Sequence, residues 1–558
     1  MTYEKDIPDY ALLPAKQPEE RVLTPITQGA VYTPVQVTHI NDICRTTIVV
    51  EEDLLVPDIR PDLKEVLDIT GKVRLASRQL GPFMKAEDTI PLTGEVELQT
   101  LYIPEKPSAG CAVISTSSRI GFRQQWHNSI PENTILTLDA EVADIECTVI
   151  NERKYRVKIT LSVTARMCRD VQLEFFEGLT DEEMQTLRDT VEITRIAVRK
   201  KDIFAVQEEL PLKDGAAFPE TILKQEISVV ENYKQATAEK VIINGFIYVS
   251  LLYTAEMDGC VDCDAPSETK CRLHHLQERV EFTQFIPLSQ SGQWSGCSVT
   301  FDGSDLRVRI APGQDGNEAL YLEGDITTWL ELYHNVEKEM IIDGYHCQKD
   351  FVCDFEETDC RTMIGTAIGE ATVREIVSTE THHGDADQIL HISASVLTGN
   401  CHAEPGKLIA EGTLRIRLIC MSADGRIFSV LHTLPYRCVT AVPYLEGKEI
   451  ICHKVFLKDF WAEKINHKQA EINAGILVSS EIMRLVPLRL LKNPAFEEKG
   501  GHTSESRPMV IYTVKEGDSL WSIAKRFQST MEAIRQSNQM EDHAVQPGHK
   551  LLILQQTV

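Results

Sequence analysis

Alternating apolar and polar residues run through most of the chain upstream of residue 493. Three runs share one form, in which a glycine near the start is followed by alternation rich in Val, Ile, Thr and Tyr. They occupy residues 92–102, 243–253 and 410–420, with Gly94, Gly245 and Gly412 as the opening glycines. Such alternation is typical of half-buried antiparallel strands.

Each of these runs lies inside a longer arrangement that occurs three times. A segment marked by proline or glutamate precedes it, at 57–67, 218–223 and 370–377, and a long β-prone run follows it, at 156–164, 319–329 and 470–478. We therefore predict three tandem β-rich, sandwich-like domains at residues 32–180, 190–346 and 350–492. The third copy departs from the pattern, because Cys420 replaces the final tyrosine and its preceding segment has no proline. Upstream of the tail, the acidic stretch 181–190 is the clearest helical candidate.

The last fifty residues follow a different pattern. Leu520, Ile523, Ala524 and Phe527 recur at helical spacing, after a short β-prone run at 511–514. Asp518 or Ser519 can cap this helix, and residues 529–532 fit a capping box for a second one. We expect Asn538 to end the second helix in a left-handed conformation, and Pro547-Gly548 to turn the chain into a strand at 551–554. The pattern predicts a strand–helix–helix–strand unit.

The core of this small unit is expected to contain apolar side chains from both helices. We assign Trp521, Ile523, Phe527 and Ile534 to it. If Phe527 is fully buried, its truncation to Ala should cost about 3–5 kcal/mol. The flanking segments look different: residues 1–31 contain Pro8, Pro14, Pro18 and Pro25 and predict a poorly ordered arm, and residues 493–508 predict a flexible linker that reaches roughly 20 Å.

Composition narrows the range of partners. The formal net charge of -27 disfavours nucleic acids and anionic membrane surfaces. No signal peptide pattern and no apolar run long enough to span a membrane is visible, and the 15 cysteines, an odd number, suit a reducing compartment. We expect a protein of the cytosol.

The tail, from Tyr512 through Trp521 and Asn538 to Ile553, resembles a LysM domain over its full length. The resemblance implies a shallow groove for N-acetylglucosamine polymers such as peptidoglycan, lined largely by backbone groups of two loops. Carried over to this chain, the groove residues are Gly517, Asp518, Ser519, Leu520, Met540, Val545, Pro547 and Gly548. Asp518 can serve as a helix cap instead of a ligand contact.

The three Gly-opened runs with their preceding segments, followed by LysM, resemble the SPOCS repeat family of endospore-forming Firmicutes, with the architecture of SipL-type coat morphogenesis proteins. The resemblance implies a non-enzymatic scaffold, made in the mother cell cytoplasm and assembled at the forespore surface. Its LysM domain would then dock on a SpoIVA-like coat-basement morphogenetic ATPase, with other coat proteins as further partners. The alternative is a cell-wall or spore-cortex protein that binds peptidoglycan.

The motifs for catalysis and cofactors are sparse. Cys260, Cys263, Cys271 and His274, with His275 beside them, form a weak candidate zinc site, and ordinary thiols are the alternative. No phosphate-binding glycine loop and no Gly-x-Ser-x-Gly elbow occurs. A third reading, a hydrolase anchored by LysM, would need a nucleophile, base or metal constellation that the sequence does not display. We therefore expect no enzyme, no cofactor and no catalytic residue.

Overall fold

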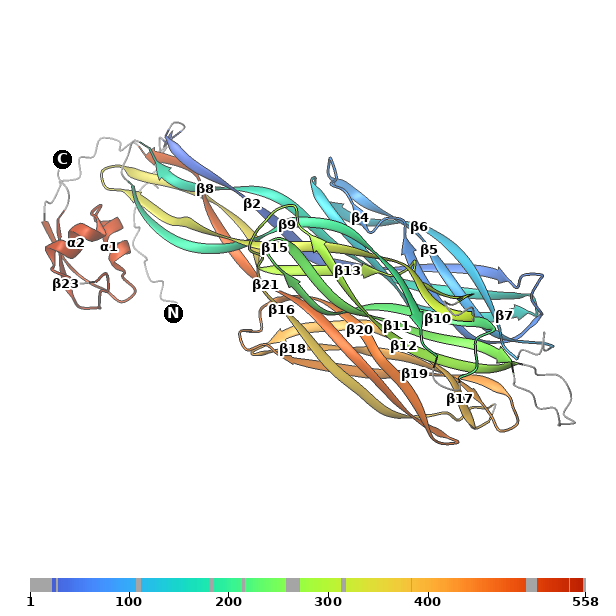
Figure 1. Ribbon diagram of the computed structural model, residues 1–558. Coiled ribbons are helices and arrows are strands. Elements are labelled where there is room, and N and C mark those ends of the chain that lie inside the picture. Colours follow the sequence, from blue (N-terminus) through green and yellow to red (C-terminus); the bar gives the residue numbers. More distant parts are fainter. Residues whose placement is uncertain are drawn as a thin grey trace, which may run out of the picture.

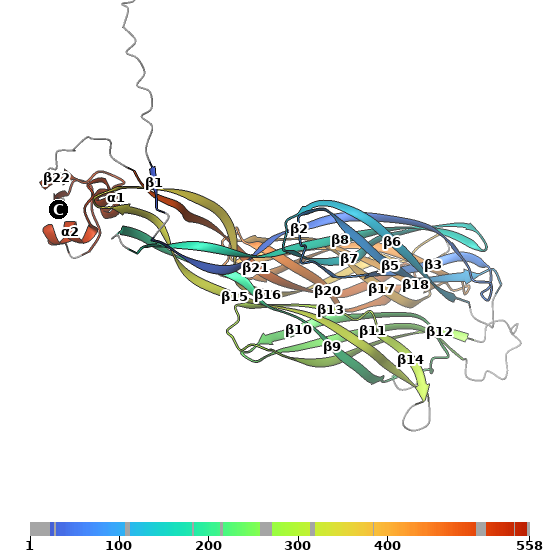
Figure 2. The same cartoon turned by 90° about the horizontal axis from the view of Figure 1, so that it is seen from above.

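The computed structural model describes residues 23–554 except 27–28, 107–111, 181–183, 213–215, 257–270, 313–317, 383, 498–508 and 541. An elongated body built from strands carries a small domain at one end (Figure 1), and the same arrangement is seen from above in Figure 2. The prediction of a mainly β chain that ends in a βααβ unit is confirmed.

Strand pairing groups the body into three units with the same order of strands. Unit 1 contains β2 (Ala30–Leu55), β3 (Leu63–Leu75), β4 (Gln79–Leu80), β5 (Glu87–Pro104), β6 (Ile114–Ile130), β7 (Thr134–Asn151) and β8 (Lys154–Leu179). Unit 2 contains β9 (Met184–Leu210), β10 (Thr221–Ala236), β11 (Lys240–Glu256), β12 (Cys271–Pro287), β13 (Gly296–Asp302), β14 (Arg307–Pro312) and β15 (Glu318–His346). Unit 3 contains β16 (Asp350–Ser378), β17 (Gln388–Glu404), β18 (Lys407–Met421), β19 (Ile427–Ala441), β20 (Ile450–Asn466) and β21 (Gln469–Glu497).

Each unit packs two antiparallel sheets against each other. One sheet is a three-stranded meander, β3-β5-β6, β10-β11-β12 or β17-β18-β19, and the other is built on a pair formed by the first and last strands of the unit. Alternate residues of both sheets fill the core between them. The three Gly-opened runs are the central strands β5, β11 and β18 of the meanders, which explains their regular alternation.

The opening glycines are required by an aromatic side chain on the neighbouring strand. Gly94 pairs with Phe122, Gly245 with Phe282 and Gly412 with Tyr436 in the strand register. A Cβ added at any of the three would lie within 2.8 Å of that ring. The glycine thus lets the aromatic side chain of the third strand lie flat across the second.

We predict that Gly94→Ala destabilises the protein by about 1–3 kcal/mol, because the new methyl group overpacks the core. Its Cβ would meet the Arg74 carbonyl oxygen at 2.4 Å and Phe122 Cζ at 2.8 Å. Gly121 on β6 is the matched control, since its nearest neighbour would lie 4.0 Å away. Gly121→Ala should be neutral or slightly stabilising. Denaturant unfolding of both variants measures the difference, and equal losses would contradict the prediction.

The tyrosine at the end of the run and the proline-marked segment belong together. The Tyr102 hydroxyl donates to the Pro61 carbonyl over 2.9 Å, and the Tyr253 hydroxyl donates to the Ala217 carbonyl over 3.2 Å. Both rings are buried. Cys420 occupies the equivalent buried position in unit 3, which explains why that unit lacks both features.

Three expectations from the sequence are wrong. Residues 184–190 are not helical but begin β9, since they pair antiparallel with the end of β15. Residues 370–377 lie within β16, so the segment of unit 3 that corresponds to 57–67 is 379–387. The arm and the linker are shorter than expected, because β1 (Leu23–Pro25) pairs with β21, and β21 runs to Glu497.

The three long strand pairs, β2-β8, β9-β15 and β16-β21, pack against each other around a common axis, beyond the ends of the meanders. We call this part the stalk, and it includes residues 30–40, 168–179, 184–196, 333–346, 350–363 and 483–497 (Figure 1). The stalk is built in layers, and each layer contains the residues at one equivalent position of the three units. The first layer consists of the register pairs Ile40–Cys168, Ile196–Tyr333 and Met363–Met483.

A register shift adjoins each of these pairs, so the same bulge recurs at the same place in all three units. Further along the stalk, Phe175, Met340 and Leu490 share one cluster, and Phe176, Ile341 and Leu491 share the next. Hydrogen bonds also cross between units. The amide of Ile196 donates to Thr38 Oγ1 over 2.9 Å, and the amide of Met363 donates to the equivalent Thr194 Oγ1 over 2.6 Å.

The tail domain contains β22 (Met509–Thr513), α1 (Leu520–Arg526), α2 (Met531–Ser537) and β23 (Lys550–Leu554). Of the two residues expected to cap α1, Ser519 does so, in a capping box with Ser522. The capping box expected at 529–532 is wrong, because Thr530 caps α2 and Glu532 pairs with Arg535. The left-handed residue after α2 is Gln539, with φ 54°, whereas Asn538 ends the helix with φ -108°.

Candidate functional site

The two groove loops of the tail domain are held side by side by backbone hydrogen bonds. Val514 donates to the His549 carbonyl over 2.8 Å, and Gly548 donates to the Val514 carbonyl over 2.8 Å. Gly517 and Gly548 have φ 84° and 90°, a region that suits glycine. A tight turn in each loop therefore presents backbone groups at the surface.

Asp518 organises the first loop. Its carboxylate accepts the Tyr512 hydroxyl at 2.7 Å and the Lys515 amide at 2.8 Å. These hydrogen bonds hold the pKa of Asp518 below its ordinary value. Asp518 thus fixes the turn from within, and the neighbouring Ser519 begins the helix.

The predicted groove residues divide into exposed and packed members. Gly517, Ser519, Pro547 and Gly548 are exposed. Leu520 is buried, so only its backbone can face a ligand, and Met540 and Val545 are half-buried against the domain core. Trp521, Ile523 and Ile534 are buried in that core, whereas Phe527 is half-buried and lies edge-on to Tyr512. The cost of Phe527→Ala should accordingly fall below the 3–5 kcal/mol of a fully buried Phe.

Asn538 links the second helix to the last strand. Its amide nitrogen donates to the carbonyls of Ile534 and Leu552, both over 2.7 Å, and its amide oxygen accepts the Leu552 amide over 2.7 Å. The Asn538 side chain thereby satisfies backbone hydrogen-bonding groups at the end of α2 and along one edge of β23. These bonds hold β23, the strand that follows the second loop, in place.

The tail domain packs on the tip of the stalk, on the end of β15. The Tyr345 hydroxyl donates to the Ser529 carbonyl over 2.6 Å, and its ring lies 5.0 Å, centroid to centroid, from that of Trp521. Leu187 and Cys347 join the same apolar cluster. The contact uses α1 and the turn after it, so the exposed groove loops remain open to solvent.

Asp343 is the polar centre of this contact. One carboxylate oxygen accepts Trp521 Nε1 at 2.8 Å and the other accepts Lys525 Nζ at 2.6 Å. Although partial burial acts to raise the pKa of Asp343, these hydrogen bonds hold it below its ordinary value. Asp343 and Tyr345 could not be predicted from the sequence, because nothing in a strand-like run marks the two residues that contact a distant domain.

We predict that this contact weakens in acid. Since the pKa of Asp343 is depressed, its contribution is present above the ordinary value of 3.8 and is lost as the pH falls through the lower folded value. Asp343→Ala should weaken docking at neutral pH by about 1–3 kcal/mol. The indole N–H resonance of Trp521, assigned with Trp521→Phe, reports docking. Asp343→Asn is the control and should abolish the pH dependence; a dependence that survives in this variant would contradict the assignment.

The candidate zinc site falls mostly outside the described residues. Cys260 and Cys263 lie in the gap 257–270, and Cys271 begins β12 next to it. His274 stacks on Tyr253 at 5.6 Å, and burial lowers its pKa. Within the described ranges, no group of three or more His, Cys, Asp and Glu side chains could hold a metal ion. In the same ranges, no helix is long and apolar enough to cross a membrane.

Comparison with known proteins supports both domain types. Residues 512–554 match the family model of the LysM domain, and residues 219–311, which lie in unit 2, match that of the SipL, SPOCS domain. A stretch of 42 residues is 40% identical to the probable autolysin SsaALP of Staphylococcus aureus (strain NCTC 8325 / PS 47). That match covers 8% of this chain and only 16% of the length of the relative. No solved structure matches the chain. The predicted combination of SPOCS and LysM is confirmed.

Proposed function

We propose that this chain is a non-enzymatic scaffold of endospore coat assembly, which docks through its LysM groove on a SpoIVA-like coat-basement morphogenetic ATPase. The proposal combines a LysM match at one end with a SipL, SPOCS match in the body. The observation that carries it is the orientation of the LysM domain. The α1 face packs on the stalk, while Gly517, Pro547 and Gly548 stay exposed at the far end of the molecule.

The same proposal assigns the chain to the mother cell cytoplasm at the forespore surface, with other coat proteins as partners of the acidic body. We also propose that units 1, 2 and 3 are the SPOCS domains, with the expected boundaries 32–180, 190–346 and 350–492 moved to the ends of their strands, and that residues 509–558 are the LysM domain. The LysM domain by itself would suit equally well a second candidate function, in which the chain binds peptidoglycan in the cell wall or the spore cortex. The similarity to a probable autolysin favours this second candidate.

Affinity capture with the full chain distinguishes the two candidates. The purified ATPase and purified peptidoglycan are offered separately to the wild type and to the double variant Glu516→Arg, Gln546→Arg. Both positions are exposed beside the groove loops, so the long side chains should block the groove without disturbing the core. Met540 and Val545 are poorer choices, because charge at half-buried positions would also test folding.

The coat proposal expects the wild type to retain the ATPase and the double variant to lose at least tenfold in affinity. Gln536→Arg, on the exposed face of α2, is the control and should bind as the wild type does. Retention of the ATPase by the double variant would move the docking surface away from the groove. Tight peptidoglycan binding without ATPase capture would establish the cell-wall alternative.

A further inference from the structure

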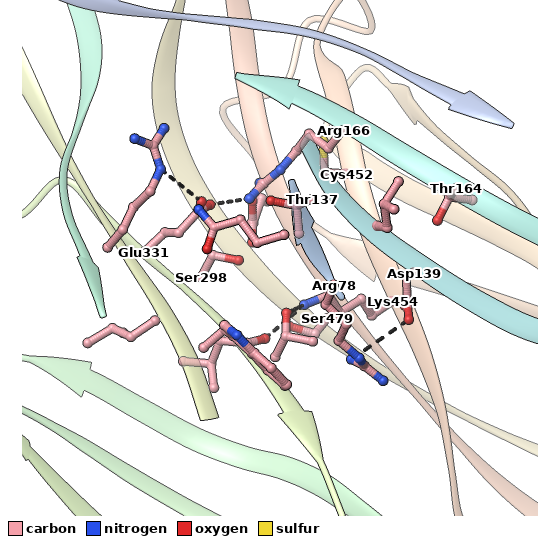
Figure 3. A pocket seen from close by; sticks show the side chains of 18 of the residues that line it. Arg78, Thr137, Asp139, Thr164, Arg166, Ser298, Glu331, Cys452, Lys454 and Ser479 are labelled. Carbon is pink, nitrogen blue, oxygen red and sulfur yellow. Dashed lines mark hydrogen bonds and ion pairs between the residues drawn. The ribbon is translucent and has the colours of Figure 1, made fainter. Parts of the chain in front are cut away.

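A cavity of about 230 Å³ lies between the three units at the base of the stalk (Figure 3). One residue from the same position of each last strand lines it, namely Thr164, Trp329 and Ser479, each four residues before the first stalk layer. A single ordered water needs only about 15 Å³ by this measure, so the cavity has room for a ligand of several non-hydrogen atoms.

The inner end of the cavity is closed by a charged cluster on the axis. Arg166 contacts Glu331, lies 3.5 Å from a Glu481 oxygen, and donates to the Tyr333 hydroxyl over 3.0 Å. Arg166, Glu331 and Glu481 occupy equivalent positions in units 1, 2 and 3. Arg199 Nε lies 3.4 Å from a Glu331 oxygen and adds a second cation for the two carboxylates, so a ligand would bind farther out.

The rest of the lining is basic, in a chain with a net charge of -27. The cationic lining residues are Arg78, Arg166, Arg199, Lys200, Lys201, Lys234 and Lys454, and the lining carboxylates are Asp139, Glu331 and Glu481. Further carboxylates behind the wall, Asp170, Glu231 and Asp302, pair with Arg199, Lys234 and Arg78. Within the described part of the chain, Lys200, Lys201 and Lys454 have no carboxylate within the 4.0 Å of an ion pair.

Lys454 is the most informative of these lysines. Its Nζ donates to the Val299 carbonyl over 2.8 Å and to Thr300 Oγ1, which leaves one of its three donors for the cavity. Burial lowers its pKa, although the nearby carboxylate of Glu481 acts in the opposite direction. Nearby, Arg199 Nη2 is buried without a hydrogen-bond partner among the described residues. Arg199 of unit 2 and Lys454 of unit 3 therefore each bring an unused donor to the lining of the cavity.

We propose that this cavity binds a small oxyanion of the phosphate class, held by Lys454 and Lys201 with further donors from Arg199 Nη2 and the Ser479 hydroxyl. A phosphate-class anion offers several acceptor oxygens to such convergent donors, and it supplies the negative charge that the three lysines lack. Trp329 and Leu330 form a wall that carries no charge. The site is independent of the LysM groove, and its ligand would stabilise the junction of the three units because only the folded body forms it.

Thermal unfolding of the full chain tests the site, with sodium phosphate compared against sodium chloride at equal ionic strength and pH. Phosphate should raise the midpoint saturably, and calorimetric titration with phosphate and with pyrophosphate should show one site per chain. Lys201→Ala and Lys454→Met should each weaken binding at least tenfold. Lys448→Ala, an exposed lysine of unit 3 outside the cavity, should bind as the wild type does.

A phosphate effect no larger than that of chloride would overturn the proposal. Unchanged affinity in the Lys201→Ala variant would overturn it as well. Lys201 is exposed, so this variant should fold and decide the matter even if Lys454→Met does not. Loss of the site would leave capture by the LysM groove unaffected, so failure here is distinguishable from failure of the proposed function.

Discussion

Replacing Arg166 by Met should lower the free energy of unfolding by roughly 3–5 kcal/mol at neutral pH. Arg166 lies on β8 between Glu331 of β15 and Glu481 of β21, and the three side chains are only 11–15% exposed. Without the guanidinium, the two carboxylates remain in a poorly solvated site, with only Arg199 beside Glu331 and Lys454 near Glu481. The loss therefore comes from the charges left behind more than from the interaction removed.

The pH dependence of this loss separates it from lost packing. Burial acts to raise the pKa of Glu481, but Arg166 and Lys454 hold it below its ordinary value. The wild type therefore gains stability from Glu481 above that value and loses it as the pH falls. In the variant the carboxylates should take up protons more readily, so its deficit should shrink on acidification. Denaturant unfolding at a series of pH values measures this, and a deficit independent of pH would contradict the explanation.

Arg156→Met is the matched control, because Arg156 lies on the same strand β8 but pairs with Asp53 at the surface, half exposed. The stability lost in this variant should be much smaller than in Arg166→Met, as for other exposed ion pairs. Equal losses in the two variants would mean that burial of the cluster of Arg166, Glu331 and Glu481 contributes nothing to the loss of stability.

The second large effect is expected from Phe175→Ala, at about 3–5 kcal/mol. Phe175 is 1% exposed and packs in the stalk cluster with Met340 of unit 2 and Leu490 of unit 3. Its truncation leaves a cavity where the three units meet, and the surrounding strands are held by their ladders and cannot collapse into it. Calorimetry should show a lower transition for the whole body.

Phe285→Ala serves as the control, since Phe285 is 57% exposed on β12. Phe285→Ala should lower the free energy of unfolding by only about 0.5 kcal/mol, as most surface substitutions do. If Phe175→Ala melts as the wild type does, the stalk does not hold the units together.

The sequence predicted the strands because their two-residue period is visible in every run. It could not predict the stalk, since Val35, Phe175 and Leu490 alternate in the same way whether they face their own sheet or a neighbouring unit. The buried charged residues on the common axis could not be predicted from the sequence for the same reason. Arg166, Glu331 and Glu481 stand at polar positions of alternating runs, where the ordinary expectation is solvent, and only the packing of the three units turns them inward.

The tail was more accessible to sequence analysis because its interactions are local. Its strand and helix order follows from turns and caps within a few residues, and the errors were shifts of one residue, from Ser529 to Thr530 and from Asn538 to Gln539. The helix assigned to 181–190 failed because a distant strand, β15, decides the conformation of its described part. Local composition cannot reveal such a partner.

The common axis of the three units also limits the stoichiometry of any assembly. Unit 1 contacts unit 2, unit 2 contacts unit 3, and unit 3 contacts unit 1, so three head-to-tail interfaces form a closed ring within one chain. Among the described residues the ring leaves no vacant copy of this interface, so a partner would have to bind another surface of the molecule. A fragment with one unit deleted would expose two complementary surfaces and could assemble with itself. Deletion of whole repeats would therefore change oligomeric state as well as binding, and point variants are the safer way to map partners.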